Sequence, residues 1–197
     1  MSKIAPSILV VVVIVSLAVG GIAGFFLGIV STKAGKAFIR DMMGDERNAE
    51  VSHPAKLVRD RFELQYPSNW KIDTEDEDHD PDHLFSIDSP GSAFVMIVIG
   101  DVASDPEDNL QTHLRQFEKL MSSPATSRFD RYGGLTGQGA TLKGRIMGIR
   151  TTVRLFACQQ DDLTVMITQQ CPDEDFKQAQ GGFSLIEKSF VLKNSAR

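Results

Sequence analysis

The sequence predicts an α+β domain, built from an antiparallel sheet flanked by helices, behind one N-terminal transmembrane helix. Three observations support this: an uncharged apolar run near the N-terminus, short alternating segments bounded by turn residues, and two amphipathic stretches of helical period. Groups of strands separated by helices are typical of antiparallel sheets on which helices pack. The expected boundaries are an N-terminal tail at 1–7, the span at 8–30, a juxtamembrane segment and tether at 31–56, and one globular domain at 57–197.

The predicted span is an uncharged run of 23 residues from Ile8 to Val30. A helix of this length measures roughly 34 Å, which is enough to cross a hydrocarbon core roughly 30 Å thick. A cleaved signal peptide is the alternative, because Lys3 is positive and Ala18 and Gly20 are small. The apolar run exceeds the roughly 7 to 15 residues of a signal core, so we expect the span to be retained.

One face of the span carries small side chains at every fourth position, namely Ser16, Gly20, Gly24 and Gly28. Residues four apart share a helix face, and small side chains there let a second helix approach closely. This packing ridge predicts contact with a membrane-protein partner or with a second copy of the chain. The alternative is that glycine is simply common in membrane helices.

The side of the membrane on which the domain lies stays open. Lys33, Lys36 and Arg40 follow the span, and the positive-inside rule then favours the cytoplasmic side of the cell (inner) membrane. A short N-terminal tail is, however, commonly left inside, and a large domain can be exported regardless of charge. The polar run at 45–52 is expected to act as a flexible tether that keeps the domain near the lipid.

The first half of the domain reads as strands. Apolar and polar residues alternate over 61–66, the turn residues 67–69 follow, and an extended pattern restarts at Trp70. Further strands are expected at 84–88 and 93–100. The second of these is a continuous apolar run, which is typical of a strand buried on both faces.

A helix should follow these strands. The segment 104–108 supplies a capping residue, a proline for the first turn and acidic residues for the positive end of the helix dipole. His113 is expected at the edge of the buried stripe rather than as a general base. The stripe itself consists of Leu110, Leu114, Phe117, Leu120 and Met121.

The second half repeats the order of strands and helix. The glycine-punctuated stretch 131–148 predicts a strand pair with bends, and 149–160 with 163–170 predicts a hairpin that turns at Asp161–Asp162. Asp173 is expected to cap a closing helix whose middle is weakened by Gly181 and Gly182. The buried side chains of this helix are expected to be Phe176, Ala179, Phe183, Ile186 and Phe190.

Two short motifs carry a resemblance to a known family. The first is Tyr66-Pro67-Ser68-Asn69-Trp70, and the second is Ser189-Phe190 at the end of the closing helix. With them the stretch 61–192 resembles the PsbP-like family, which is widespread in bacteria. The resemblance implies a PsbP-like α/β/α sandwich and a role in binding or assembly at membrane complexes, without a shared catalytic constellation. Trp70 and Phe190 are expected to be core residues.

Composition narrows the function further. A net charge of −5 argues against nucleic-acid binding, which needs a clustered basic surface.

The two cysteines are expected to be too far apart to form a disulfide. The hairpin register sets Cys158 opposite Val165 and Cys171 opposite Thr152, so the two cysteines are about 20 Å apart along the strands. A disulfide needs Cα atoms within about 7 Å, so two free thiols are expected. No nucleophile elbow is present, and we expect neither enzymatic activity nor a cofactor.

One loop is a candidate for a divalent-metal site. Its possible ligands are Asp76, Asp78, His79, Asp80, Asp82 and His83. A solvated acidic loop is the alternative, because the ligand spacing of a calcium loop is missing. The sequence therefore predicts a membrane-anchored, non-enzymatic accessory or scaffold subunit that docks on a membrane protein complex. The alternative function is a tethered domain that binds a small ligand or a divalent metal near the membrane.

Overall fold

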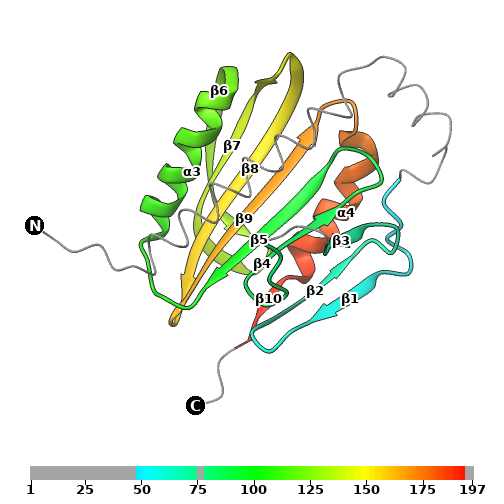
Figure 1. Cartoon of the computed structure of the whole chain (residues 1–197), viewed down its shortest axis with the longest axis vertical. Coiled ribbons are helices and arrows are strands. Elements are labelled where there is room, and N and C mark those ends of the chain that lie inside the picture. The colour runs from blue at the N-terminus through cyan, green and yellow to red at the C-terminus, as the bar shows by residue number, and fades with distance from the viewer. Residues whose placement is uncertain (1–47, 75–77, 194–197) are drawn as a thin grey trace, which may run out of the picture. The chain divides into compact units, whose positions relative to one another are not determined.

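The computed structural model describes residues 48–74 and 78–193, which form two antiparallel sheets and two helices (Figure 1). The three-stranded sheet has the order β1-β2-β10, with β1 (Ala55–Val58), β2 (Phe62–Tyr66) and β10 (Val191–Leu192). The seven-stranded sheet has the order β3-β4-β5-β9-β8-β7-β6, with β3 (Lys71–Asp73), β4 (Leu84–Asp88), β5 (Phe94–Gly100), β6 (Met121–Tyr132), β7 (Leu135–Ile146), β8 (Ile149–Gln160) and β9 (Leu163–Pro172). The helices are α3 (Pro106–Leu120) and α4 (Phe176–Ser189). The expected antiparallel sheet with flanking helices is confirmed.

The predicted span at 8–30 lies outside the described residues. Within residues 48–74 and 78–193, neither helix has the length and apolar character needed to cross a bilayer.

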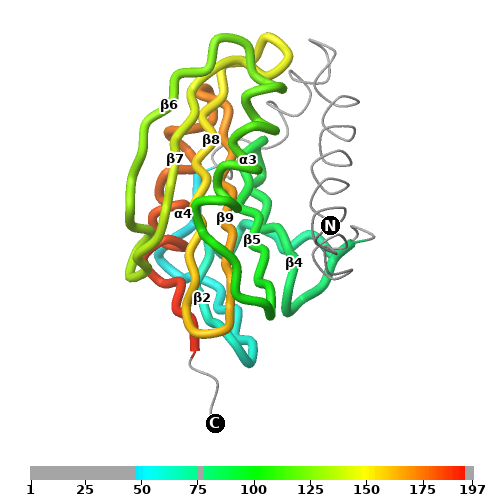
Figure 2. Tube along the Cα trace, turned by 90° about the vertical axis from the view of Figure 1, so that its left-hand side faces the viewer, coloured from blue at the N-terminus to red at the C-terminus, as the bar shows by residue number. Residues whose placement is uncertain are grey.

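One face of the seven-stranded sheet is covered by α3, which contacts β6, β7, β8 and β9 (Figure 2). The helix starts as expected, with Pro106 in the first turn and the Asp105 carboxylate accepting a hydrogen bond of 2.8 Å from the Glu107 N–H. Its buried side chains pack on the β7–β8 hairpin in a cluster that includes Leu110, Leu114, Phe117, Leu142 and Leu155.

The end of α3 differs from the prediction. Leu120 is exposed, and the buried Met121 already belongs to β6, which follows without a connecting loop. The expected start of this strand pair at residue 131 was therefore wrong by ten residues. Most of β6 is exposed, so it shows no apolar alternation, and its pairing with β7 is what makes it a strand.

The other face carries α4 and the three-stranded sheet. Their core side chains include Phe62, Leu64, Trp70, Phe85, Ile97, Phe183 and Phe190, all of them buried. Because β1 and β2 come from the start of the domain and β10 from its end, closure of this sheet brings the two ends of the folded unit together. The helix α4 lies against β2 and β9.

The start of α4 corrects a second prediction. The N-cap is Asp175 rather than Asp173, and its side chain makes no capping bond. Instead, its carboxylate accepts a hydrogen bond of 3.0 Å from the Ser92 N–H. Phe176 in the first turn is 48% exposed, so it does not join the buried stripe as expected. Ser92 lies more than 80 residues before Asp175, so the local sequence around α4 does not predict this hydrogen bond.

The expected hairpin of β8 and β9 has the predicted register. Cys158 lies opposite Val165 and Cys171 opposite Thr152. Both cysteines are buried and free, as expected.

The folded unit begins earlier than the predicted boundary at Leu57. The strand β1 starts at Ala55, and residues ahead of it already bond to the domain. The Ala49 N–H donates to the Gln178 carbonyl at 3.0 Å, and the Glu50 carbonyl accepts from the Ser68 N–H at 3.2 Å. The C-terminal end of the expected tether is therefore part of the fold.

Gly182 in the middle of α4 has a packing role. A Cβ atom at this position would lie 2.5 Å from Trp70 Cζ2 and 2.8 Å from Pro67 Cγ. The missing side chain lets α4 approach the turn that contains Pro67 and Trp70. The low helix propensity of glycine is the cost of this close contact.

Candidate functional site

The predicted packing ridge of Ser16, Gly20, Gly24 and Gly28 lies outside the described residues and stays a prediction. Of the candidate metal ligands, Asp76 also lies outside them. Asp78 and His79 are partly buried in the segment before Asp80, and the other three candidates, Asp80, Asp82 and His83, belong to one polar network.

Asp80 organises the loop between β3 and β4. One of its carboxylate oxygens accepts hydrogen bonds from the N–H groups of Asp82, at 2.9 Å, and His83, at 3.2 Å. The other oxygen lies 3.1 Å from His83 Nδ1. Partial burial raises the pKa of Asp80, but these hydrogen bonds and the His83 ring outweigh that effect and hold the pKa below its ordinary value.

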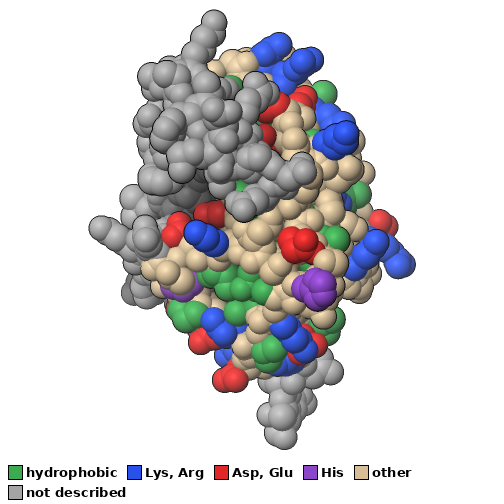
Figure 3. All heavy atoms as spheres, turned by 90° about the vertical axis from the view of Figure 1, so that its right-hand side faces the viewer, with side chains coloured by type: hydrophobic (Ala, Val, Ile, Leu, Met, Phe, Trp, Pro, Cys, Tyr) green, Lys and Arg blue, Asp and Glu red, His purple; other side chains and the backbone are tan. Residues whose placement is uncertain are grey.

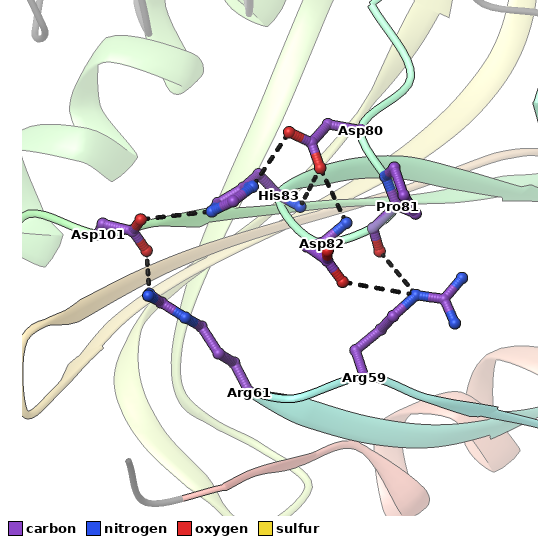
Figure 4. A network of polar contacts seen from close by, with 7 residues as sticks. All are labelled: Arg59, Arg61, Asp80, Pro81, Asp82, His83 and Asp101. Atoms are coloured by element: carbon purple, nitrogen blue, oxygen red, sulfur yellow. Dashed lines mark hydrogen bonds and ion pairs between the residues drawn. The ribbon is translucent and has the colours of Figure 1, made fainter. Parts of the chain in front are cut away.

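The His83 ring lies between two carboxylates (Figure 4). On the side away from Asp80, His83 Nε2 lies 3.4 Å from Asp101, at the end of β5. Asp101 also forms an ion pair with Arg61, which directly precedes β2. These contacts join three segments that are far apart in the sequence.

Arg59 attaches the same loop to the turn between β1 and β2. Its Nε donates to the Pro81 carbonyl at 3.1 Å and lies 3.6 Å from the Asp82 carboxylate. The charges of this loop are thus engaged with neighbouring segments. Among residues 48–74 and 78–193, no three His, Cys, Asp or Glu side chains are arranged to hold a metal ion. The metal site stays a prediction.

The family-motif residues are structural. Trp70 is 2% exposed and meets Phe183 edge-on, with ring centroids 5.5 Å apart. Phe190 is also buried, and its ring lies 6.0 Å from that of Phe62. Ser189 Oγ accepts a hydrogen bond of 2.8 Å from the Gln65 N–H, next to Tyr66. The expectation that Trp70 and Phe190 are core residues is confirmed.

The two thiols are poor nucleophiles. Burial raises the pKa of Cys158 to about 11. Burial, with smaller contributions from the carboxylates of Asp175 and Asp173, raises the pKa of Cys171 to about 12. Both are therefore protonated at neutral pH, whereas a reactive cysteine needs a lowered pKa.

His113 is one of the buried residues of α3. Its Nδ1 lies 2.9 Å from the Asn109 carbonyl of the same helix. Burial lowers the pKa of His113, and the contact with Asn109 opposes that effect only in part. The predicted place at the buried stripe is confirmed.

A groove of about 240 Å³ between α4 and the sheet was not anticipated from the sequence. Thr152, Arg154 and Gln169 line it from β8 and β9, and Phe176, Phe183 and Glu187 line it from α4. It combines an exposed aromatic ring, a buried one and a charged pair. Aromatic rings beside a few polar and charged groups are typical of the lining of binding sites.

Arg154 is the central side chain of the groove. Its Nη1 donates to Glu187 at 2.8 Å and to Gln169 at 3.2 Å, and its second nitrogen reaches the other Glu187 oxygen at 3.5 Å. The guanidinium carbon lies 4.8 Å from the centre of the Phe129 ring and 6.0 Å from that of Tyr132. An arginine held by a carboxylate and aromatic rings is oriented in a way that a lysine would not be.

Tyr132 contacts both Arg154 and Gln169. It is 1% exposed, and its hydroxyl accepts a hydrogen bond of 2.8 Å from Gln169 Nε2. Burial raises the pKa of Tyr132, and the Glu187 carboxylate raises it further. The polar groups around Arg154 are therefore hydrogen-bonded to one another.

Sequence reasoning missed the groove because its members are far apart in the chain. Glu187 lies 33 residues beyond Arg154. The available signal was the polar pair Arg154 and Gln169, which the predicted hairpin register places opposite each other.

No protein-family model matches this chain, and no curated protein matches it. Solved structures do show similarity. LpqN of Mycobacterium tuberculosis, described as involved in cell envelope biogenesis, is 15% identical, with 83% of this chain and 98% of that chain covered and a TM-score of 0.48. The Ran-binding protein Mog1p of Saccharomyces cerevisiae is 9% identical, with 71% and 95% covered and a TM-score of 0.48. PsbP of the cyanobacterium Synechocystis is 10% identical, with 73% and 94% covered and a TM-score of 0.46. The family that the sequence resembles is thus represented among these structures, at a similarity that carries no argument about function.

Proposed function

We propose that this chain is a non-enzymatic accessory subunit, held beside a membrane by its N-terminal span, whose domain docks on a partner subunit of a membrane complex. The observation that carries the proposal is the groove beside α4, where the exposed Phe176 adjoins the ion pair of Arg154 and Glu187. Aromatic and arginine side chains dominate binding energy in protein interfaces.

The geometry of the groove favours a protein segment as its occupant. Phe183 is 7% exposed and forms an apolar floor, while Phe176 offers about half of its surface to a partner. The charged pair beside them is only partly buried, so a docking chain would desolvate it further and gain orientation from it.

A non-enzymatic role is supported by the packing of the cysteine and histidine side chains that could otherwise react. The thiols of Cys158 and Cys171 are buried with raised pKa values, and His113 contacts its own helix. In the described part of the chain these groups pack rather than react.

The test is recovery of the native assembly from its membrane. The full-length chain is solubilised gently, and the intact complex is identified by mass spectrometry. Replacing Phe176 with Ala should lower recovery of a defined partner about tenfold, which corresponds to roughly 1.4 kcal/mol of interface energy. Val102→Ala is the matched control, because Val102 is 57% exposed outside the groove. Equal recovery with both variants would contradict the proposed docking site.

The predicted span contributes a separate contact. Gly24→Leu should weaken association with the partner, because the larger side chain would block close helix approach at the packing ridge. The domain should remain folded by circular dichroism. Unchanged association would remove the ridge from the proposal.

A tethered ligand-binding domain is the second candidate, favoured by the convergence of Arg154 and Gln169 on one groove from adjacent strands. An arginine with a neighbouring amide is suited to a carboxylate or another small anion. A small molecule retained through purification, with no protein partner, would select this alternative.

A further inference from the structure

The turn between β7 and β8 is built from an unusual residue. Met147 and Gly148 form a two-residue turn in which both φ angles are positive, 51° and 84°. Turns of this kind favour asparagine, aspartate or glycine at the first position, because a larger side chain is strained there. Met147 is 70% exposed, the highest value for a large apolar side chain among the described residues. Neither burial nor turn geometry accounts for a methionine here.

Other apolar side chains surround this tip. Ile146 and Ile149 pair with each other directly beside the turn, and both are partly buried. The first residue of β6, Met121, pairs with Ile146, which brings the end of α3 to the same place. There Leu120 is 46% exposed. The tip thus presents Met147 above a partly covered apolar base.

Cationic side chains flank this apolar tip. Arg145 pairs with Arg150 across the hairpin, and Lys143 pairs with Thr152 two residues further along the strand. Positions two apart on a strand share a face, so Lys143 and Arg145 lie on the same side of the hairpin. Lys119 in the last turn of α3 adds a fourth charge. All four side chains are exposed.

This concentration of positive charge contrasts with the rest of the chain, whose net charge is −5. Two acidic residues lie beside the cationic tip: the Asp173 N–H donates to the Arg150 carbonyl at 2.9 Å, the Asp173 carboxylate accepts from the Thr152 hydroxyl at 3.3 Å, and Glu174 follows. At the other end of β8 the turn is acidic, Asp161–Asp162. Figure 3, which keeps the vertical direction of Figure 1, shows Lys and Arg side chains with some acidic ones at the upper end, and further Lys and Arg side chains lower on the same face.

We propose that the β7–β8 tip docks on an anionic lipid surface, with Met147 in the headgroup region and Lys119, Lys143, Arg145 and Arg150 against the lipid phosphates. An apolar side chain ringed by lysine and arginine is the arrangement that binds the interface of an anionic bilayer. The acidic Asp161–Asp162 turn at the far end of β8 is repelled from the same surface. The hairpin therefore has a preferred orientation, with the Met147 end toward the lipid.

This inference goes beyond the proposed function, because it assigns a second surface and a lipid occupant rather than a protein. The two can fail separately. Loss of a partner on Phe176→Ala does not bear on the tip, and absence of lipid contact at the tip leaves the α4 groove untouched.

The test places an environment-sensitive fluorophore at the tip of the full chain through Met147→Cys. The native thiols of Cys158 and Cys171 are buried, so the new cysteine reacts selectively under native conditions. The chain is reconstituted into vesicles of phosphatidylcholine alone or with phosphatidylglycerol. Val102→Cys carries the control probe, since Val102 is exposed on the loop after β5.

The expected result is a blue shift of the Met147→Cys probe on vesicles that contain phosphatidylglycerol, and its reversal in roughly 0.5 M salt. The Val102→Cys probe should not shift. Adding Arg145→Gln and Arg150→Gln should lower the docking equilibrium constant about 25-fold, at roughly fivefold for each charge. These positions are exposed, and circular dichroism checks that the fold is kept.

Three results would overturn the proposal: no shift on anionic vesicles, an equal shift on pure phosphatidylcholine, or an equal shift at both probe positions. A shift that appears only when a partner protein is added would assign the tip to protein binding instead, and would likewise overturn the lipid proposal.

Discussion

The two faces of the seven-stranded sheet are constructed from different parts of the chain. On one face α3 follows β5 directly and leads into β6, and its apolar stripe meets the nearby β7–β8 hairpin. On the other face α4 packs with β1, β2 and β10, which come from both ends of the folded unit. The first face is an apolar contact between one helix and the β7–β8 hairpin. The second needs long-range closure, and it also contains the polar cluster around Arg154.

The difference between the α3 face and the α4 face indicates where a binding site can form in this fold. On the α3 face the helix and the hairpin are packed by side chains such as Leu110 and Leu155, both 0% exposed. The α4 face is tightly packed at Gly182 but opens into a groove at Phe176 and Glu187. Close packing at Gly182 and the proposed docking groove therefore lie on the same face of the sheet.

The largest expected effect tests the apolar character of the α3 face. Leu110→Ala should lower the free energy of unfolding by about 3 kcal/mol, because it removes a fully buried side chain and leaves a cavity. Urea unfolding of the full chain in mild detergent measures this. Leu120→Ala on the same helix is the control, and its loss should stay below about 1 kcal/mol because Leu120 is 46% exposed. Similar losses in both variants would contradict the assigned helix face.

The second prediction tests tight packing on the α4 face. Gly182→Ala should destabilise the domain by about 1 to 3 kcal/mol, because the new methyl group overlaps Trp70 and Pro67. Gly181→Ala is the control, since its Cβ would lie 3.7 Å from Val51 and meets ordinary contact only. Helix propensity alone makes that variant up to about 1 kcal/mol more stable. If both variants raised the urea midpoint, the close approach of α4 to Trp70 would be wrong.

The third prediction concerns the polar cluster that sets the α4 face apart. In a double-mutant cycle with Arg154→Met and Glu187→Gln, the coupling free energy should be about 1 to 2 kcal/mol, since the pair is partly shielded and stacked on aromatic rings. Lys56 and Glu63 form a comparison pair, 3.2 Å apart with side chains 52% and 36% exposed. Their coupling should stay below about 0.5 kcal/mol. Equal coupling would show that the groove pair behaves as an ordinary surface contact.

The smallest effect is a pH dependence that belongs to the α3 face. Burial lowers the pKa of His113 in the folded chain, so the unfolded state binds a proton more readily. The stabilisation is fully present above the unfolded pKa of about 6.5 and is lost as pH falls through the folded pKa. The urea midpoint of the native chain should therefore fall below about pH 6.5 more steeply than that of His113→Gln. Parallel pH profiles would contradict the buried neutral imidazole.

Local signals in the sequence predicted local structure well. The segment 104–108 predicted a capping residue and a proline in the first turn, and the structure has Asp105 and Pro106 at these positions. The Asp161–Asp162 turn determines the register of β8 and β9, and hence the separation of the two thiols. Each of these inferences depends on contacts between near neighbours in the chain.

The failures occur where a distant residue decides the outcome. The α4 cap lies at Asp175 because its carboxylate bonds to Ser92, and β6 begins at Met121 because β7 pairs with it. The C-terminal end of the tether is ordered by Gln178 and Ser68. Each of these partners lies far along the chain, so the local sequence of the segment does not predict the contact.

The candidate sites divide in the same way. The lysines and arginines near Met147 are close together in the sequence, although their common surface depends on the hairpin and on α3. The groove was not predictable, because Arg154 and Glu187 meet only when α4 folds back over the sheet.

By itself the sequence determined the fold class, the order of strands and helices in most of the domain, the hairpin register and the free thiols. It also predicts the span at 8–30. The tertiary structure alone decided the split into two sheets, the close contact of Gly182 with Trp70, and the groove around Arg154. The physical reason is that caps, turns and periodicity arise from interactions a few residues apart, whereas burial and side-chain pairing across the fold exist only after distant segments have packed together.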